Sequence, residues 1–165
     1  MKIAIDANVL VEWVTGDEFT IARLDALFAA PDIVLIIPTP ALAEFLVGAD
    51  EVGYQWLNSM EGKSRFQIAA FDRRAAMECA LLEAKARRNG NKKGGSKAAW
   101  QKVKVDWQVL AIAKLQGATV LMAPATQLSQ FANGCGMETR VIDDLPLPES
   151  VKQRKLELEP PEDNS

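Results

Sequence analysis

The chain has 165 residues, of which 48% are hydrophobic and 25% charged, and its formal net charge is −3. This length fits one domain with a buried core, and no apolar run approaches the roughly 20 residues that a membrane span needs. The first residues do not form a signal peptide, because their apolar stretch is short and an acid interrupts it. We therefore expect a cytoplasmic location.

The sequence contains no histidine. This absence excludes Ser-His-Asp and Cys-His catalysis, HExxH zinc hydrolysis and histidine-based cleavage of RNA. The two cysteines, Cys79 and Cys135, lie far apart and predict reduced thiols, with too few soft ligands for zinc. A hydrolytic enzyme with this composition must work with carboxylates, a lysine or an oxygen-bound metal.

The predicted elements alternate between strands and helices along the chain. Strands are predicted at 2–5, 33–37, 66–69, 119–122 and 138–142, and the continuous aliphatic run at 33–37 is typical of a central parallel strand. Helical spacing of apolar residues predicts helices at 8–14, 18–30, 41–47, 52–60, 72–88, 103–116 and 125–132. Asp72 is expected to cap the helix that it begins. The order indicates an α/β fold with a parallel sheet and helices on both faces, and such folds bind ligands at the carboxyl ends of their strands.

A basic segment interrupts this pattern. Eight positive side chains and no acid lie between positions 85 and 104: Lys85, Arg87, Arg88, Lys92, Lys93, Lys97, Lys102 and Lys104. The segment is either a solvated helix end with a loop, a phosphate-binding arm, or a docking site for an acidic segment. As an arm it would bind nucleic acid through Arg87, Arg88, Lys92, Lys93, Lys97 and Lys102. Trp100 and Trp107 flank it and could stack on bases, although core packing is favoured for Trp107.

Three acids stand out, and each has a structural alternative. Asp6 ends the first predicted strand, where it could cap the next helix or serve a site. Glu44 lies in an apolar helix, where solvent exposure is the simpler interpretation. Asp106 precedes another apolar helix, where it could complement the helix dipole. Together, three acids near the carboxyl edge of a sheet predict an oxygen-ligand site for Mg²⁺ or Mn²⁺, with all three acting as metal ligands and catalytic residues.

The segments around these acids resemble the motifs of the PIN-domain family. Residues 6–11 (Asp-Ala-Asn-Val-Leu-Val) resemble the opening motif, which includes Asn8 as a supporting residue. Residues 38–46 resemble the second motif, with Glu44 as its acid, and residues 106–121 resemble the third, with Asp106 as its acid. The resemblance extends over about residues 1–145, and the order and spacing of the three motifs make the set fairly specific.

The resemblance implies a PIN-like three-layer α/β/α sandwich with a mostly parallel central sheet. It also implies a Mg²⁺- or Mn²⁺-dependent endoribonuclease, similar to the VapC-type toxins of bacterial toxin–antitoxin systems. Such toxins are held inactive by a cognate antitoxin and commonly form homodimers. We expect a nuclease domain at 1–148, with a basic loop insertion at about 87–104, and a charged, disordered tail at 149–165.

One departure from the family pattern concerns the segment after the predicted strand at 119–122. The family often carries a fourth acid, or an Asn, Ser or Thr, there, but this chain has Pro124 and Ala125 at the expected place. Thr126 or Ser129 could supply a hydroxyl or hold a metal-bound water. The alternative function is therefore a catalytically attenuated PIN-like module that binds RNA or a protein partner.

Overall fold

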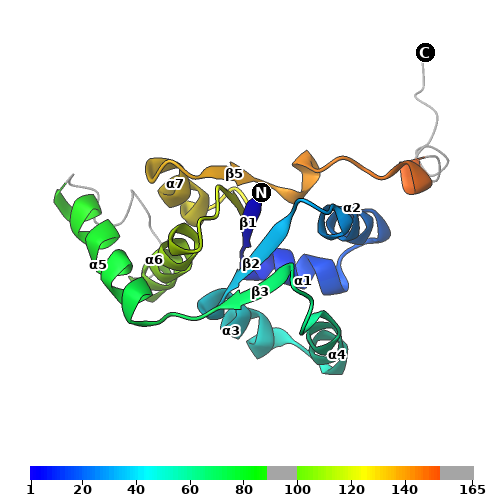
Figure 1. Ribbon diagram of the computed structural model, residues 1–165, viewed down its shortest axis with the longest axis horizontal. Helices are drawn as coiled ribbons and strands as arrows, with labels where there is room; N and C mark the ends of the chain where they lie inside the picture. The colour runs from blue at the N-terminus through cyan, green and yellow to red at the C-terminus, as the bar shows by residue number, and fades with distance from the viewer. Residues whose placement is uncertain (89–99, 153–165) are drawn as a thin grey trace, which may run out of the picture.

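The computed structural model describes residues 1–88 and 100–152, without the side chains of Trp100 and Gln127 (Figure 1). Five strands form one sheet in the order β3-β2-β1-β4-β5, and every neighbouring pair is parallel. The strands are β1 (Lys2–Ile5), β2 (Val34–Pro38), β3 (Phe66–Ala69), β4 (Val120–Met122) and β5 (Glu138–Arg140). The predicted α/β fold with a parallel central sheet is confirmed.

Helices cover both faces of the sheet (Figure 1). One face carries α1 (Ala7–Thr15), α2 (Glu18–Ala29) and α4 (Glu51–Met60), and the other carries α5 (Arg73–Arg88), α6 (Trp100–Leu115) and α7 (Gln127–Gly134). α3 (Thr39–Gly48) lies at the carboxyl edge of the sheet, and the 3₁₀ helix η1 (Ile142–Asp144) follows β5. Within the described residues, no helix is long and apolar enough to cross a membrane.

The alternation of side chains along the strands builds two separate cores. Ile3 and Ile5 of β1 point into the core under α1, α2 and α4, whereas Ala4 points into the core under α5, α6 and α7. β2 and β4 alternate in the same way. Burying a large aliphatic side chain, rather than leaving it in water, stabilises the folded state by about 1.5–3 kcal/mol. Packing on both faces therefore stabilises the sheet.

Trp13 belongs to the first of these cores. Its ring packs edge-on against Trp56 with centroids 5.2 Å apart, and its indole Nε1 donates a hydrogen bond to Asp25 Oδ1 at 2.8 Å. The ring is buried within the chain.

A topological switch point lies between β1 and β4. From β1 the chain builds β2 and β3 on one side, and it later returns to build β4 and β5 on the other. The connections therefore diverge at the carboxyl ends of β1 and β4, where open α/β sheets leave a ligand-binding crevice. The amide of Asp6 donates a hydrogen bond to the Met122 carbonyl at 3.0 Å, which fixes Asp6 at this point.

Some predicted boundaries differ from the structure. α6 begins at Trp100 rather than at residue 103, so Lys102 lies in its first turn. Residues 149–152 were predicted to begin a disordered tail but are helical, because the amides of Val151 and Lys152 bond to the Pro148 carbonyl. Residues 89–99 and 153–165, which hold the rest of the predicted loop and tail, lie outside the described residues.

Candidate functional site

Asp6 occupies the N-cap position of α1 without acting as a cap. Its backbone is extended, with φ −79° and ψ 161°, but its side chain accepts no capping hydrogen bond. Instead, Asp6 Oδ2 accepts a hydrogen bond from Asn8 Nδ2 at 3.0 Å. Only 5% of Asp6 is exposed, so this carboxylate is buried and partly available for another ligand. The capping interpretation of Asp6 is therefore not supported.

Glu44 lies on α3, which follows β2 directly. Pro40 stands in the first turn of this helix, where its missing amide hydrogen costs nothing. Ala41 packs into one core and Phe45 into the other, so α3 is anchored on both sides of the sheet edge. Glu44 is therefore held beside α6, where it forms an ion pair with Lys102. The sequence favoured a solvent-exposed Glu44, and the side chain is instead partly buried and paired.

Asp106 lies six residues inside α6. It is 3% exposed, and apolar side chains surround it along the helix, including Val103, Trp107 and Leu110. The dipole interpretation of Asp106 is wrong, because the favourable interaction of an acid with a helix dipole is confined to the first turn. Burying an unpaired carboxylate costs free energy, so its position calls for a cation or a proton.

The three acids share one electrostatic environment. Burial raises the pKa of Asp106 to about 6, Lys102 opposes this rise, and the charges of Asp6 and Glu44 raise the pKa further. Such effects require proximity, since charges far apart are screened by water and salt. The fold thus places the carboxylates of Asp6, which follows β1, of Glu44 on α3 and of Asp106 on α6 where their charges act on one another.

Lys102 lies between two of these carboxylates. Its Nζ is 3.5 Å from Glu44 Oε1 and 3.9 Å from Asp106 Oδ1. Lys102 was predicted to belong to the basic arm, and its place between these carboxylates was not predicted. The available signal was its spacing from Asp106, because residues i and i+4 share one helix face, but the predicted helix began at residue 103 and so left Lys102 out.

The donors fit a hard divalent cation in their chemistry. Asp6, Glu44 and Asp106 offer carboxylate oxygens, which Mg²⁺ and Mn²⁺ prefer, and an ammonium group lies against two of them. In the described part of the chain, however, no three acidic or thiol side chains already form a coordination group. Metal binding would therefore require these carboxylates to converge.

A hollow of about 360 Å³ opens beside Asn8. Its lining includes Glu12, one turn after Asn8 on α1, together with Pro124 and Asp143. Neither Glu12 nor Asp143 was predicted from the sequence as a site residue. Asp143 reaches this place because its Oδ1 pairs with Arg23 Nη1 at 2.7 Å, which ties η1 to α2.

The segment after β4 presents no carboxylate beside Asp6. Ser129 Oγ donates a hydrogen bond to the Pro124 carbonyl at 2.7 Å, so this buried hydroxyl closes the turn. Thr126 is exposed at the start of α7 and lines another hollow, of about 280 Å³, which none of Asp6, Glu44 and Asp106 lines. No described contact between Thr126 and the three acids therefore supports the role predicted for Thr126.

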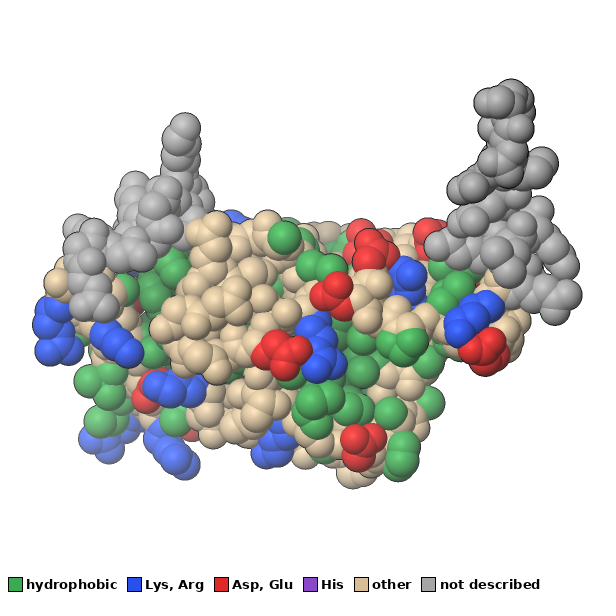
Figure 2. Space-filling model, turned by 90° about the horizontal axis from the view of Figure 1, so that it is seen from above, with side chains coloured by type: hydrophobic (Ala, Val, Ile, Leu, Met, Phe, Trp, Pro, Cys, Tyr) green, Lys and Arg blue, Asp and Glu red, His purple; other side chains and the backbone are tan. Residues whose placement is uncertain are grey.

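The described members of the basic arm lie at one end of a helix pair. α5 and α6 are antiparallel, since Ala75 lies near Ile112 while Ala86 lies near Trp107. Lys and Arg side chains gather at the α5 end in Figure 2, and acids and bases are interleaved elsewhere on that face.

Two basic residues at the end of α5 have partners of their own. Arg87 Nη2 pairs with Glu83 Oε2 at 3.3 Å, and Arg88 Nε donates to the Ala84 carbonyl. The candidates Lys92, Lys93 and Lys97 lie outside the described residues, as does the side chain of Trp100.

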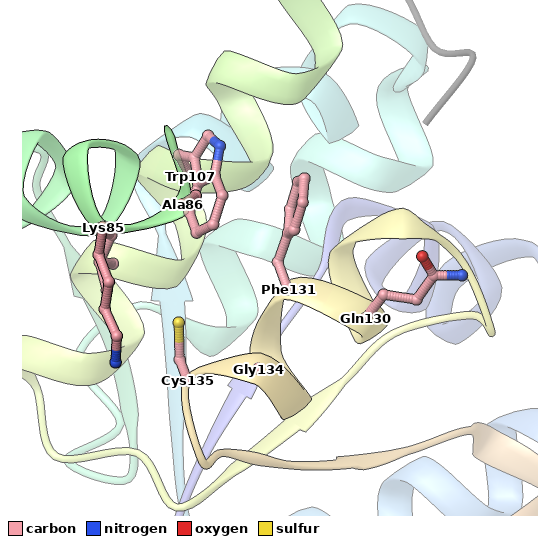
Figure 3. A pocket seen from close by; sticks show the side chains of 8 residues that line it. Lys85, Ala86, Trp107, Gln130, Phe131, Gly134 and Cys135 are labelled. Atoms are coloured by element: carbon pink, nitrogen blue, oxygen red, sulfur yellow. The ribbon is translucent and has the colours of Figure 1, made fainter. Parts of the chain in front are cut away.

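A small cavity between α5, α6 and α7 is separate from the carboxylates (Figure 3). It measures about 150 Å³, and Trp107 lines it while stacking on Phe131 with ring centroids 4.2 Å apart. The favoured core position of Trp107 is confirmed. Burial raises the pKa of the Cys135 thiol, which also lines the cavity, and raises that of Cys79 to about 11. Both thiols are therefore protonated at neutral pH.

Comparisons with known proteins identify a family and a shared fold. The PIN domain family model matches residues 3–130, whereas no curated relative matches the chain by sequence. A solved structure of VapBC2 from Rickettsia felis, bound to a DNA fragment from their promoter, has a TM-score of 0.58 at 14% identity, covering 86% of this chain and 98% of that chain.

Two further solved structures show the same likeness. DNA-bound VapBC from Salmonella typhimurium has a TM-score of 0.57 at 18% identity, covering 86% of this chain and 98% of that chain. VapBC-1 from nontypeable Haemophilus influenzae has a TM-score of 0.57 at 14% identity, covering 87% of this chain and 99% of that chain. At these identities the likeness concerns the fold.

Proposed function

The chain belongs to the PIN domain family, and from that premise we propose that it is a metal-dependent endoribonuclease that hydrolyses RNA phosphodiester bonds. The observation that carries the proposal is the grouping of Asp6, Glu44 and Asp106 near the switch point of the sheet, where the charges of Asp6 and Glu44 raise the pKa of Asp106 and two of the three acids are buried. A chain without histidine has few other groups for this chemistry.

Each residue has a defined part in the proposed site. Asp6, Glu44 and Asp106 hold Mg²⁺ or Mn²⁺, which when bound lowers the pKa of water and offsets charge on the phosphodiester. Asn8 donates to one oxygen of Asp6, which fixes the rotamer of that carboxylate. The hollow beside Asn8, which Glu12 and Asp143 also line, is the proposed place for a nucleotide.

The RNA strand is proposed to approach along the α5 end of the molecule. Arg87 and Arg88 lie at that end, and Lys92, Lys93 and Lys97 follow in sequence. Cationic side chains release counterions from the phosphate backbone when they bind it, and this release drives association.

The cellular role proposed for this nuclease is that of a toxin with a cognate antitoxin, acting in the cytoplasm as a homodimer. The support is that the similar solved structures are VapBC complexes. Expression of the wild type should then arrest growth, and Asp6→Asn should not. Growth arrest that persists with Asp6→Asn would contradict the toxin role.

The deciding experiment is RNA cleavage by the purified chain with Mn²⁺ or Mg²⁺, with an EDTA control. Asp6→Asn and Asp106→Asn should each lower the rate by about 100-fold or more, because several kcal/mol of transition-state stabilisation is lost. Asp32→Asn is the matched control, since it makes the same change at an exposed turn before β2 and should cleave like the wild type.

Two outcomes would overturn the nuclease. Cleavage by Asp106→Asn at the wild-type rate would contradict the assignment of Asp106 to the catalytic site. A folded wild type that binds RNA in EDTA but cleaves it with neither ion would favour the attenuated binding module, with the apolar segment at Pro124 and Ala125 as its cause.

A further inference from the structure

The Lys102 ammonium interacts with carboxylates on two helices, α3 and α6. It is close to Glu44 Oε1 on α3 and to Asp106 Oδ1 on its own helix, at 3.5 Å and 3.9 Å. The Lys102 side chain is 51% exposed, whereas Asp106 is buried. The ammonium therefore caps the buried carboxylate from the solvent side and connects α3 to α6.

These contacts are loose. A strong ion pair between an ammonium and a carboxylate has a distance of about 2.7–2.9 Å, and both contacts of Lys102 are longer. Lysine is a compact charge on a flexible four-carbon stem, and half of this side chain is already in solvent. Lys102 can consequently leave the carboxylates without disturbing the helix backbone.

A divalent cation and this ammonium would compete for the same oxygens. Two positive charges about 4 Å apart repel each other by about 1 kcal/mol per unit charge product even in water, and by more near a protein surface. The carboxylates also have to converge before they can coordinate a metal, and the ammonium lies between two of them.

We propose that Lys102 is an internal competitor for the divalent cation, which neutralises Glu44 and Asp106 in the metal-free protein and must leave them before the metal binds. This inference rests on the proposed metal site and deepens it. It assigns to Lys102 control of metal affinity, so that the nuclease would be held in a metal-free state at low metal concentration.

The test is Mn²⁺ binding to the full-length chain by calorimetry, without RNA and at one pH. Lys102→Gln should bind Mn²⁺ about fivefold more tightly than the wild type or better, since a repelling unit charge is removed. Lys102→Arg keeps the charge and should bind like the wild type.

Lys114→Gln is the matched control. It removes the same charge from the same helix, where Lys114 Nζ pairs with Glu78 Oε1 at 2.6 Å. Its Mn²⁺ affinity should stay at the wild-type value, and thermal unfolding of each variant checks that the fold is retained.

The outcomes separate this inference from the proposed function. Unchanged affinity in Lys102→Gln, in a wild type that binds Mn²⁺ and cleaves RNA, would overturn the competitor and leave the nuclease standing. Weaker binding by Lys102→Gln would also overturn it, because Lys102 would then be preparing the carboxylates for the metal. No Mn²⁺ binding by any variant would overturn the competitor and the metal site together.

Discussion

At the residue scale, the protonation of Asp106 links the site to stability. Its pKa of about 6 in the folded chain lies above the ordinary value of 3.8, chiefly because the carboxylate is buried. The folded state therefore binds this proton more tightly than the unfolded state does. It follows that the contribution of Asp106 to the free energy of unfolding decreases as the pH rises from about 4 to about 6, and stays low above that window.

Replacing Asp106 with Asn should therefore stabilise the metal-free protein. We expect the free energy of unfolding to increase by about 1–3 kcal/mol at pH 7.5, where the wild-type carboxylate is charged and buried. The gain should diminish toward pH 4, where the wild type is already protonated in the folded state. Urea unfolding in EDTA across this range measures the difference, and a gain that is constant with pH would contradict the assignment.

At the element scale, α5 has one buried face and one exposed face. Leu82 is 6% exposed and packs into the core with α6, whereas its neighbour Leu81 is 63% exposed. The two residues have the same side chain on the same helix, one position apart. They therefore separate the contribution of packing from that of helix propensity.

Truncation of these two leucines should have unequal effects. Leu82→Ala should lower the free energy of unfolding by about 2–4 kcal/mol, because it removes buried methyl groups and leaves a cavity. Leu81→Ala should change it by no more than about 0.5 kcal/mol, because its side chain is already in water. Denaturant unfolding of the two variants provides the measurement. Equal losses of stability would contradict the assignment of Leu82 to the buried face of α5 and of Leu81 to the exposed face.

At the scale of the whole molecule, the net charge is −3 but the charges are unevenly distributed. The last turn of α5 carries Lys85, Arg87 and Arg88. An anionic strand would be attracted to this end in spite of the negative total charge.

RNA affinity should depend on salt through this end of the molecule. The double variant Arg87→Gln/Arg88→Gln should reduce the slope of log affinity against log salt by roughly 1.4, since each phosphate contact contributes about 0.7 for a single strand. Arg73→Gln/Arg74→Gln removes the same charge from the opposite end of α5 and serves as the control. The slopes are measured in EDTA, and equal slopes in both double variants would contradict the proposed approach of the strand.

The features that depend on local pattern could be predicted from the amino-acid sequence. Local sequence pattern predicted each strand of the sheet. It also predicted Asp72 as a helix cap, and the prediction is confirmed because Asp72 Oδ1 accepts a hydrogen bond from the Ala75 amide at 2.9 Å. The three motif acids could be named because each lies in a recognisable local context. The rule that parallel strands place their carboxyl ends at one edge then predicted their proximity.

The arrangement of charges around Asp106 depends on contacts between elements that are far apart in the chain. Lys102 contacts Glu44 because α3 packs against α6, and these helices are distant in sequence. The burial of Asp106, which raises its pKa, likewise comes from the packing of α6 onto the sheet. Local pattern predicts where a helix lies and which face is apolar, but burial and ion pairing depend on neighbours that only the folded chain brings together.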